Sequence, residues 1–106
     1  MNENQVYGLA ATDIQNVLSV LLQNQNVLKI ILFGSRAKGS FQPGSDVDLA
    51  LIGKNLSLND IIEASIQLDK LNLPYKFDLI IYDRIKEQAL IEHIDRAGIV
   101  LSERII

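Results

Sequence analysis

The stretch VLKIILFGSRAKGSFQPGSDVDLALIG, residues 27–53, decides the fold. Its first part, 27–33, has the length and the β-branched content of a buried strand. Gly34 breaks this strand, one helical turn can follow, and the Pro-Gly pair at 43–44 is a strong turn signal. A second apolar run, 47–52, is closed by a further glycine. The stretch therefore predicts two strands joined by a short helical turn and a loop.

The flanking residues predict helices and further strands. Residues 1–11 are expected to form a short leader. Apolar residues then follow the i, i+3, i+4, i+7, i+8 spacing of an amphipathic helix, which Thr12 or Asp13 can cap. The later expected elements are a helix that opens with a capping box of Ser57 and Asp60 and ends at Pro74, a strand over 77–82, a helix over about 85–97 that Gly98 ends, and a short strand over 99–101. This order indicates an α+β fold, a small mixed β-sheet with helices packed on it.

Composition restricts the class of protein and of partner. With 106 residues, 48% hydrophobic and 22% charged, the chain is expected to form one globular domain over residues 1–106. Its net charge is −3 and it has no basic stripe, so direct nucleic-acid binding is not expected, and a small nucleotide or a protein partner fits better. The absence of cysteine excludes disulfides and thiolate metal sites. We see no signal peptide and no apolar stretch long enough to span a membrane, so a cytoplasmic location is expected.

Asp46 and Asp48 form the first candidate site. They are two residues apart at the start of a predicted strand, so their side chains point to the same face. Two carboxylates on one face repel each other unless a cation lies between them. Oxygen ligands favour Mg²⁺ or Mn²⁺ over zinc. Such a pair is common by chance, and an aspartate at a strand entry is more often a solvated turn residue, so the pair alone identifies no site.

Gly34 and Ser35 form the second candidate site. Backbone N–H groups at a junction from strand to helical turn can bind phosphate oxygens, and the serine hydroxyl adds a donor. Arg36 and Lys38 place positive charge beside them. Taken alone, a plain joint with a serine cap is the more frequent interpretation. The combination is far more specific, because ten residues separate this pair from Asp46 and both halves fall at predicted strand ends.

The segment GSRAKGSFQPGSDVDLALI, residues 34–52, resembles the signature of the polymerase beta nucleotidyltransferase superfamily. The chain is most similar to the minimal nucleotidyltransferases (MNT, or MntA-like proteins) of prokaryotes, in motif over residues 31–53 and in element order throughout. That family places a third carboxylate on a later strand, where Asp78 matches. Asp83 is the competing candidate, but it follows the strand and fits a helix cap better. Lys38 stands where the family often has arginine.

The resemblance implies a polymerase-beta-type fold and a metal-dependent nucleotidyltransferase. ATP would be the substrate, and two Mg²⁺ or Mn²⁺ ions would be bound. The implied catalytic residues and metal ligands are Asp46, Asp48 and Asp78, and it stays open whether Asp78 is only a ligand or also the general base. The implied phosphate-binding residues are Gly34, Ser35, Arg36 and Lys38, with Arg36 neutralising charge on the leaving pyrophosphate.

The resemblance also implies an acceptor. In the family a separate HEPN-domain protein is the partner, and the MNT member acts as the antitoxin that adenylylates a tyrosine of this toxin. Two alternatives remain, a non-catalytic antitoxin that binds a nucleotide and a small-molecule nucleotidyltransferase of the antibiotic-modifying type. A purely structural α+β domain fits the combined motif poorly.

Two further features were interpreted from the residues alone. His93, the one histidine, is expected at an exposed helix position and not as a ligand. The apolar tail, Ile105 and Ile106, is compatible either with a partner contact or with capping of the core.

Overall fold

A four-stranded mixed sheet lies at the centre of the computed structural model, which describes residues 5–105. The strands are β3 (Val27–Phe33), β4 (Val47–Gly53), β5 (Phe77–Ile81) and β6 (Ile99–Glu103), in the sheet order β5-β4-β3-β6. β3 pairs antiparallel with both β4 and β6, whereas β4 and β5 are parallel. The mixed sheet expected from the sequence is thereby confirmed, with β3 and β4 in the middle.

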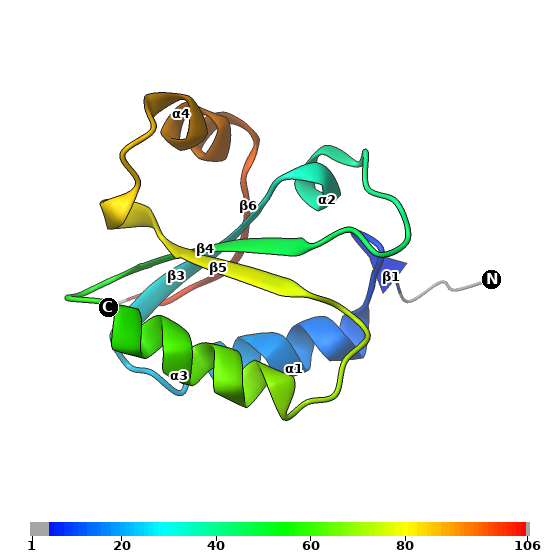
Figure 1. Ribbon diagram of the computed structural model, residues 1–106, viewed down its shortest axis with the longest axis horizontal. Helices are drawn as coiled ribbons and strands as arrows, with labels where there is room; N and C mark the ends of the chain where they lie inside the picture. The colour runs from blue at the N-terminus through cyan, green and yellow to red at the C-terminus, as the bar shows by residue number, and fades with distance from the viewer. Residues whose placement is uncertain (1–4, 106) are drawn as a thin grey trace.

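Helices cover both faces of the sheet (Figure 1). Helices α1 (Ala11–Leu21) and α3 (Leu58–Asp69) lie together on one face. Helix α4 (Gln88–Ala97) and the single turn α2 (Ser35–Lys38) lie on the other. A 3₁₀ turn, η1 (Tyr82–Arg84), joins β5 to α4. Within residues 5–105, no helix is long and apolar enough to cross a membrane.

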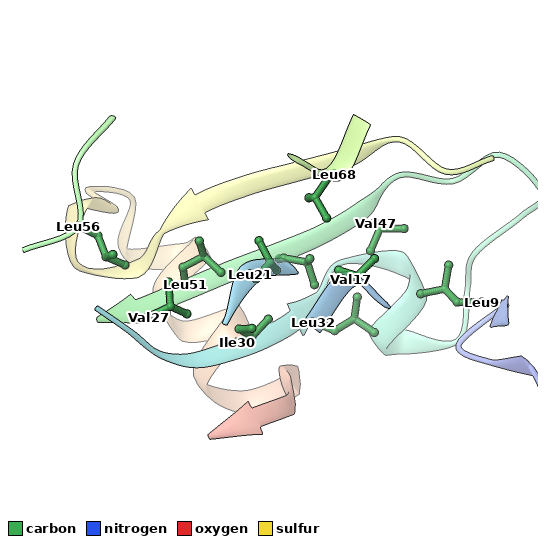
Figure 2. Close-up of a cluster of buried hydrophobic side chains, with 11 residues drawn as sticks. Leu9, Val17, Leu21, Val27, Ile30, Leu32, Val47, Leu51, Leu56 and Leu68 are labelled. Carbon is green, nitrogen blue, oxygen red and sulfur yellow. The ribbon is translucent and has the colours of Figure 1, made fainter. Parts of the chain in front are cut away.

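Strand alternation divides the apolar side chains between two cores. On the side of α1 and α3, Leu32 of β3 and Leu49 of β4 are completely buried together with Leu21 and Leu68 of the two helices. Figure 2 shows side chains of this cluster against the strands of the sheet. A smaller cluster under α4 contains Ile31, Phe33, Ala50 and Ile94. Because Leu49 and Ala50 face opposite cores, Asp48 must share the face of Ala50, which is the α4 side.

The predicted leader is wrong for residues 5–10, which form an antiparallel hairpin of β1 (Gln5–Val6) and β2 (Leu9–Ala10). Tyr7 and Gly8 make the two-residue turn, both with positive φ (57° and 75°), as a type I′ hairpin requires. Leu9 anchors the hairpin because it is buried in the main core. The rest of the expected leader, residues 1–4, lies outside the described residues.

Several helix ends differ from the sequence expectation. α1 begins at Ala11, and neither Thr12 nor Asp13 caps it, because Ala10 holds the N-cap position and the Asp13 carboxylate accepts from the Tyr75 hydroxyl instead (3.0 Å). α4 begins only at Gln88, since Ile85 is extended. Asp83 therefore lies in the 3₁₀ turn and does not cap this helix. The capping box is confirmed, with the Ser57 N–H donating to Asp60 Oδ2 at 2.7 Å.

The tail contributes little to the core. Ile105 is 98% exposed, so it does not cap the core as one interpretation suggested. Ile106 lies outside the described residues. Arg104, by contrast, is held against the end of α1 and the start of β3, donating to the carbonyl oxygens of Leu22 and Val27.

Candidate functional site

Asp48 and Asp78 lie side by side at one end of the sheet. The parallel register of β4 and β5 pairs Asp48 with Asp78, and the antiparallel register of β3 and β4 pairs Asp48 with Phe33. Their neighbours Val47, Leu49, Phe77 and Leu79 all pack into the α1–α3 core. Both carboxylates therefore project from the opposite face, beside the end of β3. Ile80 packs under α4, so Asp78, two residues before it, shares that face by the alternation of a strand.

Like charge surrounds Asp48. Burial raises its pKa above the ordinary value, and the nearby Asp78 and Asp46 carboxylates raise it further. Asp48 is half-buried, whereas Asp46 and Asp78 are exposed. The three predicted carboxylates are thus close enough to interact, and their mutual repulsion favours a bound cation.

The carboxylates fit a metal that the substrate helps to bind. Among the described residues, no group of three His, Cys, Asp or Glu side chains is placed so as to hold a metal ion. Mg²⁺ usually takes one or two carboxylates and completes its shell with waters and substrate phosphates, and it prefers oxygen ligands. An all-oxygen group around Asp48 and Asp78, open to solvent on its far side, matches that requirement.

Gly34 brings the turn after β3 against this group. Its φ of 78° and ψ of −155° belong to a backbone region that is essentially restricted to glycine. A Cβ built at this position would overlap Oδ2 of Asp48. The backbone at Gly34 therefore lies directly against the Asp48 side chain, which only a residue without a Cβ allows. The two candidate sites in the sequence become one site in the structure.

Ser35 and Lys38 begin and end the helical turn that follows. The Ser35 carbonyl accepts from the Ser40 N–H at 3.0 Å, which closes the turn, and Gly39 ends it in the left-handed conformation. Lys38 is exposed, and its ammonium group helps to lower the pKa of His93, whose ring contacts Gly34. Lys38 therefore brings positive charge near the histidine that contacts Gly34.

Arg36, which was expected at the phosphates, is buried and bonded to backbone carbonyl oxygens. Only 4% of its surface is exposed, and the guanidinium donates to the carbonyl oxygens of Tyr7 (3.0 Å) and Ser45 (2.8 and 3.2 Å). Its plane also lies over the rings of Phe41 and Tyr75, 5.3 and 5.7 Å from their centroids. Its Nε and both terminal nitrogens are engaged, so we expect Arg36 to hold the loop before Asp46 and not to contact pyrophosphate. Its burial depends on the hairpin that the sequence did not indicate.

His93 is a site residue that was not expected. The Gly34 N–H donates to its Nε2 at 3.2 Å, and its ring meets the ring of Phe33 edge-on, with centroids 6.3 Å apart. The residue is half-buried, so the prediction of an exposed helix position is wrong. A signal was present, because Leu90, His93, Ile94 and Ala97 follow the i, i+3, i+4, i+7 spacing of the buried helix face.

Two concavities lie outside the carboxylate site. A groove of about 500 Å³ runs along β5 and is lined by Ile80, Ile85 and Leu90 among others. Ile80 follows Asp78 on the same face of β5, so this apolar groove leads away from the carboxylates. A cleft of about 390 Å³ between α1 and α3 lies on the opposite face of the sheet, away from these side chains.

Comparison with known proteins identifies relatives of this architecture. A family model described as "Polymerase beta, Nucleotidyltransferase" matches residues 15–105. No protein with a curated description matches the chain significantly.

Three solved structures show the fold. A toxin–antitoxin complex with AMP-PNP contains a chain that is 22% identical, with a TM-score of 0.71 over 86% of this chain and 73% of that chain. A complex of tri-AMPylated HEPN toxin with MNT antitoxin from Shewanella oneidensis contains a chain that is 19% identical, with a TM-score of 0.67 over 89% of this chain and 72% of that chain. A candidate minimal nucleotidyltransferase is 24% identical, with a TM-score of 0.67 over 84% of this chain and 89% of that chain. At these identities the likeness establishes the fold alone, and it confirms the polymerase-beta-type α+β fold that the resemblance implied.

Proposed function

Since the chain belongs to the polymerase beta nucleotidyltransferase family, whose model spans residues 15–105, we propose that it transfers AMP from ATP to a hydroxyl acceptor. One observation carries the proposal. Asp48 lies in register beside Asp78 on one side and against Gly34 on the other, at the turn to which we assign the phosphates. This arrangement brings anion-binding donors and cation-binding carboxylates together, as transfer of a phosphoryl-containing group requires.

The triphosphate would bind along the turn after β3. The Gly34 N–H, the Ser35 hydroxyl and the Lys38 ammonium group are the donors we assign to its phosphate oxygens. Arg36 is left out because its guanidinium is engaged by backbone carbonyl oxygens. It contributes indirectly, by fixing the loop that ends in Asp46.

The carboxylates would serve the reacting atoms. Asp48 and Asp78 would hold Mg²⁺ together with phosphate oxygens of the substrate, with Asp46 close beside them, and the ion when bound would stabilise negative charge on the entering and leaving oxygens. The acceptor oxygen attacks the α-phosphorus and forms a new P–O bond, while the bond to the bridging oxygen breaks and pyrophosphate leaves. The acceptor proton must go to a base, and the exposed Asp78 carboxylate at the solvent side of the site is the group we assign to it.

We propose a HEPN-domain protein as the partner and one of its tyrosines as the acceptor, so that the chain acts as the antitoxin of the pair. Two of the similar structures support this assignment, because one is a toxin–antitoxin complex with AMP-PNP and the other contains a tri-AMPylated HEPN toxin. The open site also suits a protein acceptor, since a side chain on another surface can reach the carboxylates without entering a cavity.

Intact-mass measurement tests the activity. The chain is incubated with ATP, Mg²⁺ and a HEPN-domain protein that co-purifies with it. We expect the partner's mass to increase by one or more AMP units, and the gain to disappear with Asp48→Asn. Asp69→Asn, at the exposed end of α3 in the opposite layer, is the matched control and should leave the transfer intact.

The same experiment separates the alternatives. A complex that binds ATP but gains no mass would identify a non-catalytic antitoxin. Release of pyrophosphate with a small hydroxyl compound in the absence of the partner would identify a small-molecule transferase. Either result would contradict the proposed acceptor.

A further inference from the structure

The Gly34 amide already has an acceptor within the chain. Its N–H donates to Nε2 of His93, a residue 59 positions later on α4. A backbone N–H carries one hydrogen and makes one good hydrogen bond. A phosphate oxygen and the imidazole of His93 therefore cannot both use this donor fully.

The imidazole is held in place to accept this bond. Its ring packs edge-on against Phe33, at an interplanar angle of 73°. Phe33, the residue before Gly34, therefore helps to orient the imidazole. Because Nε2 accepts, the proton of the neutral ring must be on Nδ1. Burial lowers the pKa of His93, and the positive charges of Lys38 and Arg96 lower it further, which keeps the ring neutral and able to accept.

We propose that His93 is a further residue of the nucleotide site, which sets the affinity for the triphosphate by competing with a phosphate oxygen for the Gly34 N–H. The inference rests on the proposed function, because it takes the glycine corner to be the phosphate site. Nucleotide binding must then break an intramolecular hydrogen bond, and the imidazole must turn away from Gly34. The energy of that bond is subtracted from the binding energy of every ligand that brings a phosphate to this position.

Removing the competing acceptor should tighten binding. His93→Phe keeps an aromatic ring against Phe33 but has no acceptor nitrogen, so it leaves the Gly34 N–H free for phosphate. A neutral hydrogen bond contributes about 0.5–1.5 kcal/mol, so we expect the Kd for AMP-PNP with Mg²⁺ to fall roughly 2- to 10-fold. Inorganic tripolyphosphate should gain by the same factor, because the contact involves only phosphate. Glu92→Gln, an exposed neighbour on the same helix, should bind both ligands as the wild type does.

Isothermal titration of the full chain decides between the outcomes. An unchanged or higher Kd for His93→Phe would overturn the competition. If neither protein bound AMP-PNP or tripolyphosphate with Mg²⁺, the proposed nucleotide site would fail and this inference with it. Binding of equal strength in both proteins would refute the role of His93 but leave the proposed nucleotide site standing.

A measurement on the wild type covers the case in which the variant does not fold. The nitrogen chemical shift of His93 Nε2 reports whether it accepts a hydrogen bond. Saturating tripolyphosphate should move this shift and that of the Gly34 amide together. A histidine signal that stays unchanged while the ligand binds would show that the bond to Gly34 persists, and it would contradict the proposal.

Discussion

Gly34 is the residue at which backbone conformation and chemistry meet. Its positive φ and the absence of a Cβ allow the end of β3 to lie against the Asp48 carboxylate. In Gly34→Ala the new methyl group would overlap Oδ2 of Asp48, and the backbone would be strained as well. We expect a loss of about 1–3 kcal/mol in the free energy of unfolding, together with loss of nucleotide binding.

Urea denaturation measures this change. Gly44→Ala is the control, because Gly44 also has positive φ but has open space where its Cβ would be. It reports the backbone strain alone, so a Gly34→Ala variant that is no less stable than the control would show that the contact with Asp48 does not matter.

Asp48 gives the site a pH dependence whose sign follows from its raised pKa. The folded state binds the proton more tightly than the unfolded state, whose pKa is near the ordinary 3.8. The stabilisation from protonated Asp48 is therefore complete below that value and is lost as the pH rises through the folded-state pKa. Metal-free Asp48→Asn should lack this loss and be more stable than the wild type at neutral pH.

Thermal unfolding with and without Mg²⁺ checks this prediction. Added Mg²⁺ should raise the Tm of the wild type, because it neutralises the repulsion from Asp46 and Asp78, and it should have little effect on the variant. A wild type that is more stable than metal-free Asp48→Asn at neutral pH would contradict the assignment of a strained carboxylate group.

At the scale of elements, Arg36 joins three segments of the chain: the turn α2, the hairpin turn and the loop before Asp46. It extends from α2 to the hairpin turn at Tyr7 and to the Ser45 carbonyl, one residue before Asp46. Lysine keeps the charge but cannot make the forked contact to Ser45. Arg36→Lys should therefore cost about 2–4 kcal/mol and loosen the Asp46 loop.

Denaturation of Arg36→Lys beside Arg84→Lys, an exposed arginine in η1, tests this role. The control should lie within about 0.5 kcal/mol of the wild type. If Arg36→Lys were equally stable but lost nucleotide affinity, Arg36 would be a phosphate ligand after all.

The start of α3 depends on its capping box. Asp60 accepts from the Ser57 N–H and hydroxyl and from the Asn24 amide, and these bonds lower its pKa. The stabilisation is present above the ordinary pKa and is lost as the pH falls through the lowered value. Ser57→Ala removes the hydroxyl and should cost about 1 kcal/mol near neutral pH, measured by urea denaturation. Ser65→Ala, an exposed serine within the same helix, should cost nothing, and equal behaviour of the two variants would rule out the cap.

Local patterns predicted the elements well and their contacts poorly. The strands over 27–33 and 47–52 were predicted almost to the residue, because each is an apolar run and the glycine after it marks where the run ends. The face of Asp78 followed from strand alternation. The contact between His93 and Gly34 could not be predicted, because it depends on where α4 crosses the sheet. The burial of Arg36 likewise required the hairpin of residues 5–10, whose two-residue strands are too short to leave a pattern.

At the scale of the whole molecule, the sheet order builds the site. β4 lies between β3 and β5, so a carboxylate at its start has the glycine corner on one side and Asp78 on the other. The layer of α1 and α3 covers the face opposite to α4 (Figure 1). Strand alternation places the carboxylates on the side of α4. Gly34, Asp48, Asp78 and His93 thus lie together at one end of a small sheet, and a partner can approach that end directly.

The function proposed for the site at this end of the sheet is transfer of the α-phosphoryl group of ATP together with its nucleoside. The most direct measurement uses ATP that is radiolabelled at the α- or at the γ-phosphorus, with Mg²⁺ and the HEPN-domain partner. Only the α-label should become attached to the partner, and Asp48→Asn and Asp78→Asn should each reduce this labelling by about a hundredfold or more. Attachment of the γ-label, or undiminished α-labelling by Asp48→Asn, would contradict it.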